Sequence, residues 1–237
     1  MACAGHVSAQ PAARRERVQV SINAGAQISS TSLDTSTLQA VYIEDAVVDT
    51  SYKYHYGSVF DGGISYKLAG RFGVGFAASW FPQPADAEIS AAVPHPFFFQ
   101  APRTVGGTAA GARRDTLAAH FQAIYTFRPA PRIEVAAGAG PSFFRVRQII
   151  VDNLSFRDTY PYDAPAFVAA STQRVSGHKA GVHASVDVSL RLSRHFGVGG
   201  MVRASQADIQ LAAPARTTIG TSKAGGVHAG GGVRIYF

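Results

Sequence analysis

The chain has 237 residues, of which 46% are apolar and only 16% are charged, against roughly 25% charged in an average globular protein. A single cysteine excludes a disulfide framework and a cysteine-based zinc site, and the 24 glycines and 12 prolines argue against a helical bundle. The formal net charge of +7 is compatible with an anionic partner, so the placement of the basic residues has to decide its kind. No run of about 20 apolar residues occurs, so the sequence predicts no membrane-spanning helix.

The first 17 residues form a separate segment. Within residues 1–10 (MACAGHVSAQ), Val7-Ser8-Ala9 has the small-residue form that precedes a signal-peptidase cleavage site, although the charged and most of the apolar part of a signal peptide is missing. We interpret residues 1–17 as the remaining tail of a secretory signal followed by a disordered lead-in. Residues 18–237 are expected to form one domain.

Apolar and polar residues alternate from Val18 onward. The alternation is clearest over 179–192, where every second residue from Ala180 to Leu192 is apolar. Because successive side chains of a strand point to opposite faces, the pattern predicts strands with one apolar face. It predicts eight of them, over 18–28, 54–68, 72–80, 117–127, 133–143, 179–192, 196–204 and 225–237.

The connections between these strands alternate in length. Three are short, at 69–71, 128–132 and 193–195, and four are long, at 29–53, 81–115, 145–176 and 205–223. An even number of strands, with both termini at the short-turn end and long loops at the other, is the layout of an outer-membrane barrel. We therefore predict an all-β fold, an eight-stranded antiparallel up-and-down transmembrane β-barrel with long extracellular loops.

The alternation by itself does not say which face is outside. A soluble lipocalin-like barrel with an apolar interior is the alternative. The polar positions are mostly Gly, Ser, Ala and His, which suit a narrow lumen better than a water-facing exterior. Aromatic residues also gather at strand ends, as in the girdles of membrane barrels. The predicted girdle consists of Tyr66, Phe72, Trp80, Tyr125, Phe127, Phe196 and Tyr236.

The last strand carries a family resemblance. It ends in Gly232-Val233-Arg234-Ile235-Tyr236-Phe237, with the terminal Phe237, Ile235 two residues earlier and Gly232 three before that. This resembles the C-terminal assembly signal of bacterial outer-membrane β-barrels, although Gly230 stands where that pattern usually has a polar residue.

The whole of residues 18–237 resembles the small eight-stranded outer-membrane barrel proteins. The resemblance implies a location in the bacterial outer membrane, with outer-membrane lipid and lipopolysaccharide around the barrel. It also implies the barrel-assembly machinery as a partner during insertion, but it implies no particular activity.

The alternation assigns nine polar residues to the interior. Buried charges have to pair or keep water, so we predict a hydrogen-bonded plug of paired charges, with a proton or small-ion path as the alternative. A metal on the three histidines lacks support from their spacing. We assign no catalytic, cofactor or metal-binding residue. The predicted lumen network is His120, Glu134, Lys179, His183, Asp187, Arg191, Arg203, His228 and Arg234.

The predicted loops carry the interaction candidates. Phe97, Phe98 and Phe99 follow a proline-rich stretch in the second long loop, and Tyr160 and Tyr162 flank a proline in the third. One interpretation is a patch for an extracellular protein or glycan. The other is that the phenylalanines fold back over the barrel mouth or into the upper leaflet, with arginines meeting lipopolysaccharide phosphates.

These features predict a non-enzymatic protein with a surface-interaction or envelope-integrity role. A narrow channel for small solutes and a lipid A-modifying enzyme using His95 and Ser90 are the alternatives. The basic residues are spread over loops, turns and lumen, and this lack of clustering argues against nucleic acid as a partner.

Overall fold

The structure is a computed structural model that describes residues 16–28 and 31–237. The predicted signal tail, apart from Glu16 and Arg17, lies outside the described residues. Within the described part there is no helix that could cross a membrane. The described residues form eleven strands: β1 (Val18–Gln27), β2 (Thr31–Val41), β3 (Glu44–Tyr54), β4 (Ser58–Ala69), β5 (Phe72–Val93), β6 (Arg103–Ala130), β7 (Ile133–Arg157), β8 (Ala166–Arg191), β9 (Phe196–Ile209), β10 (Thr217–Ile219) and β11 (Ser222–Tyr236).

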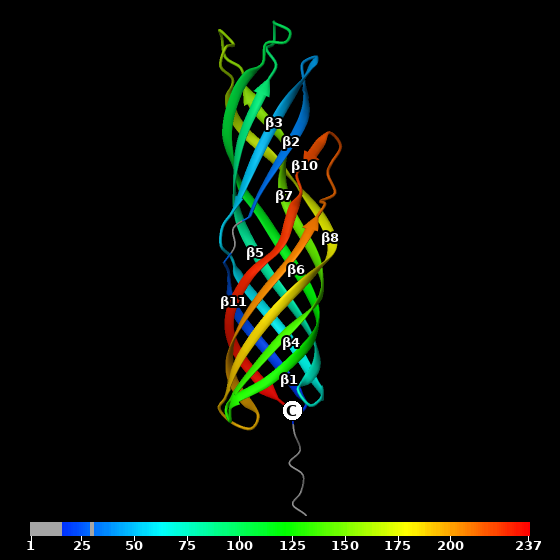
Figure 1. Cartoon of the computed structure of the whole chain (residues 1–237). Coiled ribbons are helices and arrows are strands. Elements are labelled where there is room, and N and C mark those ends of the chain that lie inside the picture. The colour runs from blue at the N-terminus through cyan, green and yellow to red at the C-terminus, as the bar shows by residue number, and fades with distance from the viewer. Residues whose placement is uncertain (1–15, 29–30) are drawn as a thin grey trace, which may run out of the picture.

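Eight of these strands close a barrel. They run in the order β1, β4, β5, β6, β7, β8, β9 and β11, every neighbouring pair is antiparallel, and β11 pairs back with β1 from Gln19↔Tyr236 to Gln27↔His228 (Figure 1). The three short turns and Phe237 lie at one end of the barrel, which we call the lower end. This confirms the predicted all-β, eight-stranded, antiparallel up-and-down barrel.

The seam between β1 and β11 depends on close backbone approach. A Cβ on Gly232 would lie 1.8 Å from the carbonyl oxygen of Ile22, whereas a Cβ on the neighbouring Gly231 would come no closer than 3.5 Å to any other group. Only glycine therefore fits at position 232 in this register.

The four predicted long loops are mostly strand. Residues 81–93 and 103–115 continue β5 and β6 upward, and residues 145–157 and 166–176 do the same for β7 and β8. Within 29–53 the β2–β3 hairpin pairs with the upper part of β5 from Val47↔Ala92 to Tyr54↔Ala85, and β10 is added to the edge of β2. The prediction that these four segments are loops is therefore wrong for most of their residues, and the connections that remain at the upper end are short.

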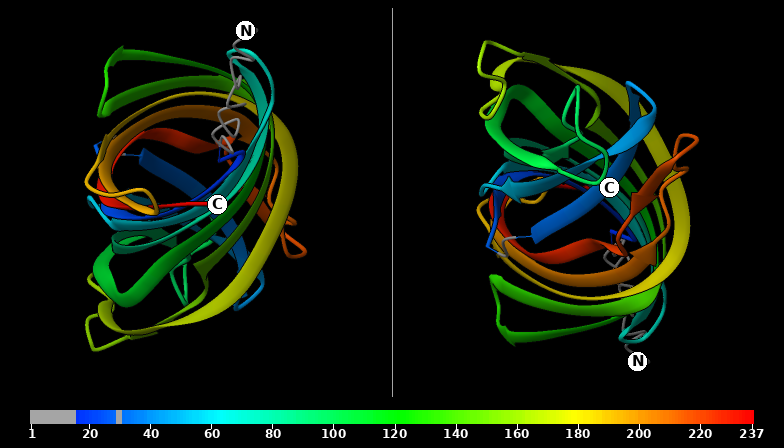
Figure 2. Two further views of the ribbon diagram at one scale, coloured as in Figure 1. Left: turned by 90° about the horizontal axis from the view of Figure 1, so that it is seen from below. Right: turned by 90° about the horizontal axis from the view of Figure 1, so that it is seen from above.

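The upper part of the molecule, which we call the head, comprises β2, β3, β10 and the parts of β5 to β8 above Trp80, Leu117, Phe143 and Val182. Its interior is an apolar cluster that includes Val48, Tyr52, Ile89, Ile150 and Leu154. Viewed from above, the extended β7–β8 hairpin lies across from the β2–β3 hairpin (Figure 2).

Side chains of the β2–β3 hairpin bond to backbone groups of β7 that the sheet leaves unpaired. The Gln39 amide accepts from the Leu154 N–H at 2.8 Å and donates to the Leu154 carbonyl at 3.0 Å, and the Tyr52 hydroxyl accepts from the Val151 N–H at 2.6 Å. Because these bonds satisfy a strand edge that would otherwise be buried unpaired, they fix the hairpin against β7.

Candidate functional site

The outer face of the barrel changes polarity at one level. Along β5 the exposed residues from Phe72 to Trp80 are all apolar, whereas Asp86 and Glu88 follow above on the same face. Along β7 the apolar Phe143 is followed by Arg145 and Arg147 on the same face. The apolar stretches span 9 residues in β5 and 11 in β6, from Leu117 to Phe127.

We call this lower apolar surface the belt. It is built from large exposed side chains on all eight barrel strands: Ile22, Phe60, Ile64, Tyr66, Leu68, Phe72, Val74, Phe76, Trp80, Leu117, Phe121, Tyr125, Phe127, Phe143, Val182, Val186, Val188, Leu190, Phe196, Val198, Val202, Val227 and Val233.

Six of the seven predicted girdle residues, all except Tyr236, lie on this outer face. The Phe72 ring packs edge-on against Tyr125 at 5.4 Å between centroids, and Trp80 stacks on Phe60 at 5.8 Å. Placing Tyr236 in the girdle was wrong, because its side chain is 1% exposed and faces the lumen. Its hydroxyl donates to Ser189 at 3.2 Å, and the Arg191 guanidinium lies 3.9 Å from its ring centroid.

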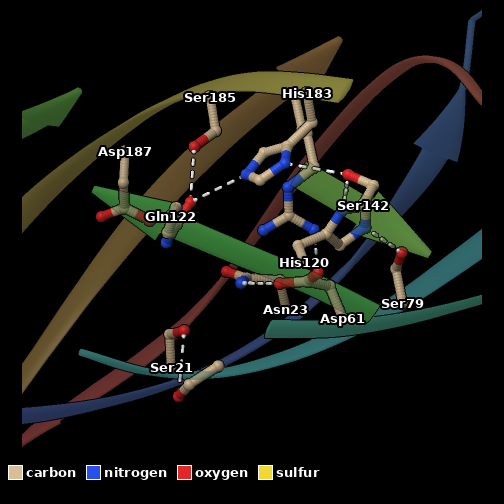
Figure 3. Close-up of polar contacts among 12 residues, drawn as sticks. Ser21, Asn23, Asp61, Ser79, His120, Gln122, Ser142, His183, Ser185 and Asp187 are labelled. Atoms are coloured by element: carbon tan, nitrogen blue, oxygen red, sulfur yellow. Dashed lines mark hydrogen bonds and ion pairs between the residues drawn. The ribbon is translucent and has the colours of Figure 1, made fainter. Parts of the chain in front are cut away.

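The middle of the lumen holds a group of paired charges that we call the charge ladder, and Figure 3 shows Asp61, Asn23 and Asp187 of this group. Arg203 pairs with Asp61, and Arg234 pairs with Asp187. Asn23 joins the two pairs, because its amide nitrogen donates to Asp61 at 3.2 Å and its amide oxygen accepts from Arg234 at 2.7 Å. The guanidinium groups are almost fully buried, and each meets the carboxylate that a buried charge requires.

A second chain of hydrogen bonds runs through two histidines beside this ladder. Ser79 Oγ lies 2.9 Å from His120 Nε2, Ser142 Oγ lies 2.8 Å from His120 Nδ1 and 2.9 Å from His183 Nδ1, and His183 Nε2 lies 3.3 Å from Gln122 Oε1 (Figure 3). All of these side chains point into the barrel.

The chemistry of the groups fixes the direction of each bond. Gln122 Oε1 is an acceptor, so His183 carries its proton on Nε2 and accepts at Nδ1 from the single hydroxyl proton of Ser142. Ser142 Oγ then accepts from His120 Nδ1–H, and His120 Nε2 accepts from Ser79. Both imidazoles are therefore satisfied in their neutral form, and every donor points the same way along the chain.

The lower end of the lumen is closed by a third cluster around Glu134. Its carboxylate accepts from Lys67 Nζ at 2.8 and 2.9 Å and from Arg128 Nε at 2.8 Å, and Arg191 Nη2 lies 3.8 Å away. Arg191 also bonds Glu16 at 2.7 Å. Three cations from different strands and turns thus converge on one buried carboxylate.

The remaining predicted lumen residues differ from this pattern. Lys179 is exposed, although the alternation had placed it inside. His228 is buried with its ring centroid 4.8 Å from that of Phe81, and neither ring nitrogen has a hydrogen-bond partner among the described residues. In the described part of the chain no group of three His, Cys, Asp or Glu side chains is arranged to hold a metal ion.

Several residues of these networks were missing from the sequence prediction. Asp61 and Lys67 lie in the weakest of the predicted strands, and Asn23 and Gln122 are uncharged residues at inward positions. All four alternate with the outward apolar residues of their own strands, and this alternation could have placed them inside the barrel.

The lumen between these clusters encloses only a small space. A cavity of about 60 Å³ lies between the charge ladder and the lower cluster, lined by Ser21, Asp61, Lys67, Gln122 and Asp187. A volume of this size holds a few water molecules, since each needs roughly 10–15 Å³ measured in the same way. Water in this cavity would meet hydroxyl, amide and carboxylate groups.

At the upper end three hairpin tips meet at one ion pair. Arg103 at the start of β6 donates to Asp158 of the β7–β8 tip at 2.5 Å, to the Tyr162 carbonyl at 2.6 Å and to the Pro94 carbonyl at 2.7 Å. Tyr42 of the β2–β3 tip donates to the same carboxylate at 2.6 Å. We call this arrangement the clasp.

The clasp changes the acidity of its members. Burial alone would raise the pKa of the Asp158 carboxyl, but the hydrogen bonds from Arg103 and Tyr42 outweigh it and hold the pKa below its ordinary value. The hydrogen bond to Asp158 raises the pKa of the Tyr42 hydroxyl. The clasp is therefore an ionised pair with a bound phenol at neutral pH.

The clasp brings the predicted loop residues together. Phe97 packs edge-on against Tyr162 at 5.3 Å, and Tyr160 lies 6.1 Å from Tyr162. Phe97, Phe98 and Phe99 are 65–72% exposed and Tyr160 is 84% exposed. With Tyr42 and Ile43 from the neighbouring hairpin, which are also exposed, these side chains form an apolar surface that we call the tip.

The groups considered for lipid A chemistry have other surroundings. His95 Nδ1 accepts from the backbone N–H groups of Phe97 and Phe98 at 3.1 and 3.3 Å, so it shapes the tip loop. Ser90 lies on the outer face of β5, opposite Asp49 of β3.

The residues of the predicted assembly signal lie along the β1–β11 seam and the lower rim. Phe237 is exposed, and its backbone N–H donates to the Val18 carbonyl at 2.9 Å. Ile235 is half-buried opposite Val20, and Gly232 occupies the close contact with Ile22 described for the seam.

The fold was compared with solved structures. Neisserial surface protein A is 12% identical with a TM-score of 0.46, over 93% of this chain and 97% of that one. The outer membrane protease OmpT from Escherichia coli is 8% identical with a TM-score of 0.49, over 97% and 99%. Ail, the attachment invasion locus protein of Yersinia pestis, is 10% identical with a TM-score of 0.38, over 92% and 99%.

No family model matches the sequence, and no curated protein matches it either.

Proposed function

We propose that this chain is an integral barrel of a bacterial outer membrane, with a closed lumen, whose head holds an apolar tip away from the bilayer for contact with another surface. The observation that carries the proposal is the change of polarity along the outer face. A soluble barrel has no use for a continuous exposed belt of Phe, Val, Leu and Ile side chains.

The dimensions of the belt support a membrane location. A strand crosses the hydrocarbon layer with about 9–11 residues when it is tilted by about 45°. The belt spans 9 residues in β5 and 11 in β6. Aromatic residues lie near both of its borders, with Tyr125 and Phe127 below and Trp80 above, as expected at the two interfaces.

The interior argues against the alternative of a solute channel. The Glu134 cluster fills the lower end, the two hydrogen-bonded networks fill the middle, and the apolar cluster of the head lies above them. A cavity of about 60 Å³ separates the lower two layers. We infer that the barrel serves as an anchor and that conduction is not its role.

The height of the tip argues against its insertion into the leaflet. The 13 residues from Phe81 to Val93 continue β5 above the belt as paired strand. At about 3.3 Å per residue and a tilt of about 45°, they raise the tip by roughly 30 Å. At this height Phe97–Phe99 do not reach the leaflet around the barrel, and their exposure of 65–72% argues against a role in covering the barrel mouth. Both observations support a contact with a separate apolar surface.

The membrane location is tested by folding the chain in detergent and in phosphatidylcholine vesicles. We expect a β-type circular dichroism spectrum, a gel band that shifts on boiling and flotation with the vesicles. A chain that stays folded and monomeric without detergent would reverse the assignment of faces and favour a lipocalin-like barrel.

The role of the tip is tested separately, on cells that carry the protein in their outer membrane. We expect adhesion to polystyrene to fall when Phe97, Phe98 and Phe99 are all replaced by Ser, while adhesion to a hydroxyl-coated surface is unchanged. The matched control replaces Ser32, Ser36 and Ser51 by Ala on the outer face of the β2–β3 hairpin. Equal adhesion of the Phe variant and the parent protein to polystyrene would refute the proposed use of the tip.

A further inference from the structure

A group of basic residues lies on the outer face of β7 and β8, directly above the belt. Arg145 and Arg147 follow Phe143 at successive outward positions of β7. In the register of the sheet, Arg145 is opposite His178 of β8 and Arg147 is opposite Ser176, while Arg174 lies one outward position higher on β8, opposite Ile149. We call Arg145, Arg147, Arg174 and His178 the basic patch.

The arginines of the patch have no carboxylate partner within the part of the chain that the structure describes. The nearest acid in register is Asp115, opposite Arg147, but its carboxylate accepts from Arg113 at 2.9 and 3.1 Å. Two exposed cations elsewhere on the head do have carboxylate partners. Lys53 bonds Glu88 at 3.0 Å, and Arg216 bonds Asp45 at 2.5 Å.

Charge is also distributed unevenly around the head. Asp34, Asp49 and Glu88 lie together on the outer face of β2, β3 and β5, whereas the unpaired arginines lie on β7 and β8. Like charges on neighbouring outward positions repel one another, and an anion placed between them removes that repulsion. The one-sided distribution therefore marks a place where an anion would be bound.

The position of the patch identifies the anion. Arg145 is two residues above Phe143, the last belt residue of β7, so its guanidinium lies at the level where lipid head groups begin if the belt is in the bilayer. Arginine offers a planar fork of N–H donors that matches the oxygens of a phosphate. The anions at this level of a bilayer are phosphate groups of lipids.

We propose that Arg145, Arg147 and Arg174 bind the phosphate groups of a phosphorylated lipid in the leaflet on the side of the head. This inference rests on the proposed membrane location and adds a site to it. It leaves the tip free, because the patch borders the belt whereas the tip lies at the far end of the same strands.

The test uses the full chain folded in phosphatidylcholine vesicles that contain a minor fraction of bisphosphorylated lipid A. After gentle solubilisation the folded protein is captured, and the lipid A that stays bound is quantified by mass spectrometry. The variant R145Q/R147Q removes two charges of the patch. The control K53Q/K223Q removes two exposed cations that face Glu88 and Asp208 instead.

We expect the parent protein to retain lipid A in excess over phosphatidylcholine. Removing one guanidinium should weaken retention of lipid A about 5-fold, since a basic residue near a charged lipid surface contributes about 1 kcal/mol of binding free energy. Removing both should weaken retention on the order of 25-fold. The control should stay within twofold of the parent. The boiling-sensitive gel band shows that both variants are folded.

Three results would overturn the site. Equal losses in the variant and in the control would mean diffuse attraction by net charge. Equal retention of lipid A and phosphatidylcholine by the parent would mean no preference for phosphate groups. Displacement of lipid A by inorganic phosphate at matching concentration would mean a site for soluble phosphate. Failure of the parent to float with vesicles would instead refute the membrane location itself, so the two failures are distinguishable.

Discussion

The polarity of the belt can be tested by placing one charge at its centre. Phe121 lies on the outer face of β6, midway between Leu117 and Phe127, and is 49% exposed. Its ring centroid is 5.1 Å from that of Phe76 and 6.2 Å from that of Phe143. The substitution F121K puts an ammonium group at the middle of the proposed hydrocarbon layer.

The expected cost has two parts. A lysine at the bilayer midplane destabilises a membrane barrel by about 2–4 kcal/mol. The loss of each aromatic contact adds roughly 0.5–1.5 kcal/mol. The variant F121L removes the ring contacts without adding a charge, so the difference between F121K and F121L isolates the first part. We expect that difference to be about 2–4 kcal/mol, a factor of roughly 30 to 1000 in the unfolding equilibrium.

The matched control places the same charge on the same strand in the head. Thr104 is exposed on the outer face of β6, opposite Ala92 of β5. Because this position faces water, T104K should change the free energy of unfolding by less than about 0.5 kcal/mol.

The measurement is urea unfolding in phosphatidylcholine vesicles, followed by the fluorescence of Trp80, the one tryptophan of the chain. Trp80 stacks on Phe60 at the upper border of the belt, so its emission reports both insertion and unfolding. If F121K and T104K destabilise the protein equally, the belt faces water. That result would refute the membrane barrel and favour the lipocalin-like alternative.

Three further predictions address the seam, the lumen and the clasp. G232A should abolish the boiling-sensitive gel band, since the added Cβ would lie 1.8 Å from the Ile22 carbonyl oxygen. The control G231A should keep the band. A folded G232A would show that the seam has another register. D61N leaves Arg203 buried without its carboxylate and should lower the free energy of unfolding by about 3–5 kcal/mol in the urea assay. The double variant D61L/R203L should recover most of that stability. A D61N barrel as stable as the parent would mean that water reaches the pair. Because the pKa of Asp158 is lowered in the folded state, the clasp contributes stability above the unfolded-state pKa and loses it as the pH falls through the folded-state pKa. Hydrogen exchange of residues 158–165 should therefore accelerate below about pH 4 in the parent protein. In D158N the exchange of the same residues should already be fast at neutral pH. An exchange rate that does not depend on pH, after correction for intrinsic exchange, would argue against the ionised clasp.

The lower barrel was predictable because each strand there keeps one apolar face. The predicted strand over 133–143 starts at the first residue of β7, and the one over 196–204 starts at the first residue of β9. Each of these strands follows a tight turn, at 131–132 and at 192–195. In this region a single rule, alternation with small or polar residues inside, describes the whole wall.

The head was not predictable by the same rule, because the apolar residues change faces. On β5 the outward apolar series ends at Trp80, and an inward apolar series begins at Phe81 and continues through Ala87 and Ile89. A strand prediction that follows the apolar residues of one face therefore ends the strand at Trp80 and assigns residues 81–93 to a loop. The β2–β3 hairpin, rich in Ser, Thr and Asp, has a weak pattern of its own and depends on pairing with β5.

Two residues show where parity was misapplied or insufficient. Tyr236 was placed outside from its position near a strand end, although Arg234, two residues earlier, had been placed inside, and alternation puts both on one face. Lys179 has inward parity, but it lies above Val182↔Gln206, the pair at which the regular ladder between β8 and β9 ends, and it is exposed there. Where a neighbouring strand ends is not visible in the sequence of the strand itself.

The clasp lay beyond any local pattern. Arg103 and Asp158 are 55 residues apart and Tyr42 and Asp158 are 116 apart, and each comes from a different hairpin. What the sequence did offer was the exposed aromatic run Phe97–Phe99 beside a proline-rich stretch, which identified the tip without the contacts that hold it.

The change of faces along β5 to β8 connects the closed lumen with the raised tip. Below Trp80 the outer face is apolar, so the polar groups of the wall have to be satisfied inside, as Asp61, Arg203 and Arg234 are. Above it the outer face is polar, so the apolar residues turn inward and pack as a core around Tyr52 and Ile150. That core lies over the polar lumen and also holds the hairpins that carry the tip. A residue change that opened the lumen from above would therefore have to break the same core that keeps Phe97–Phe99 in place, and this shared core supports the contact surface proposed for the tip.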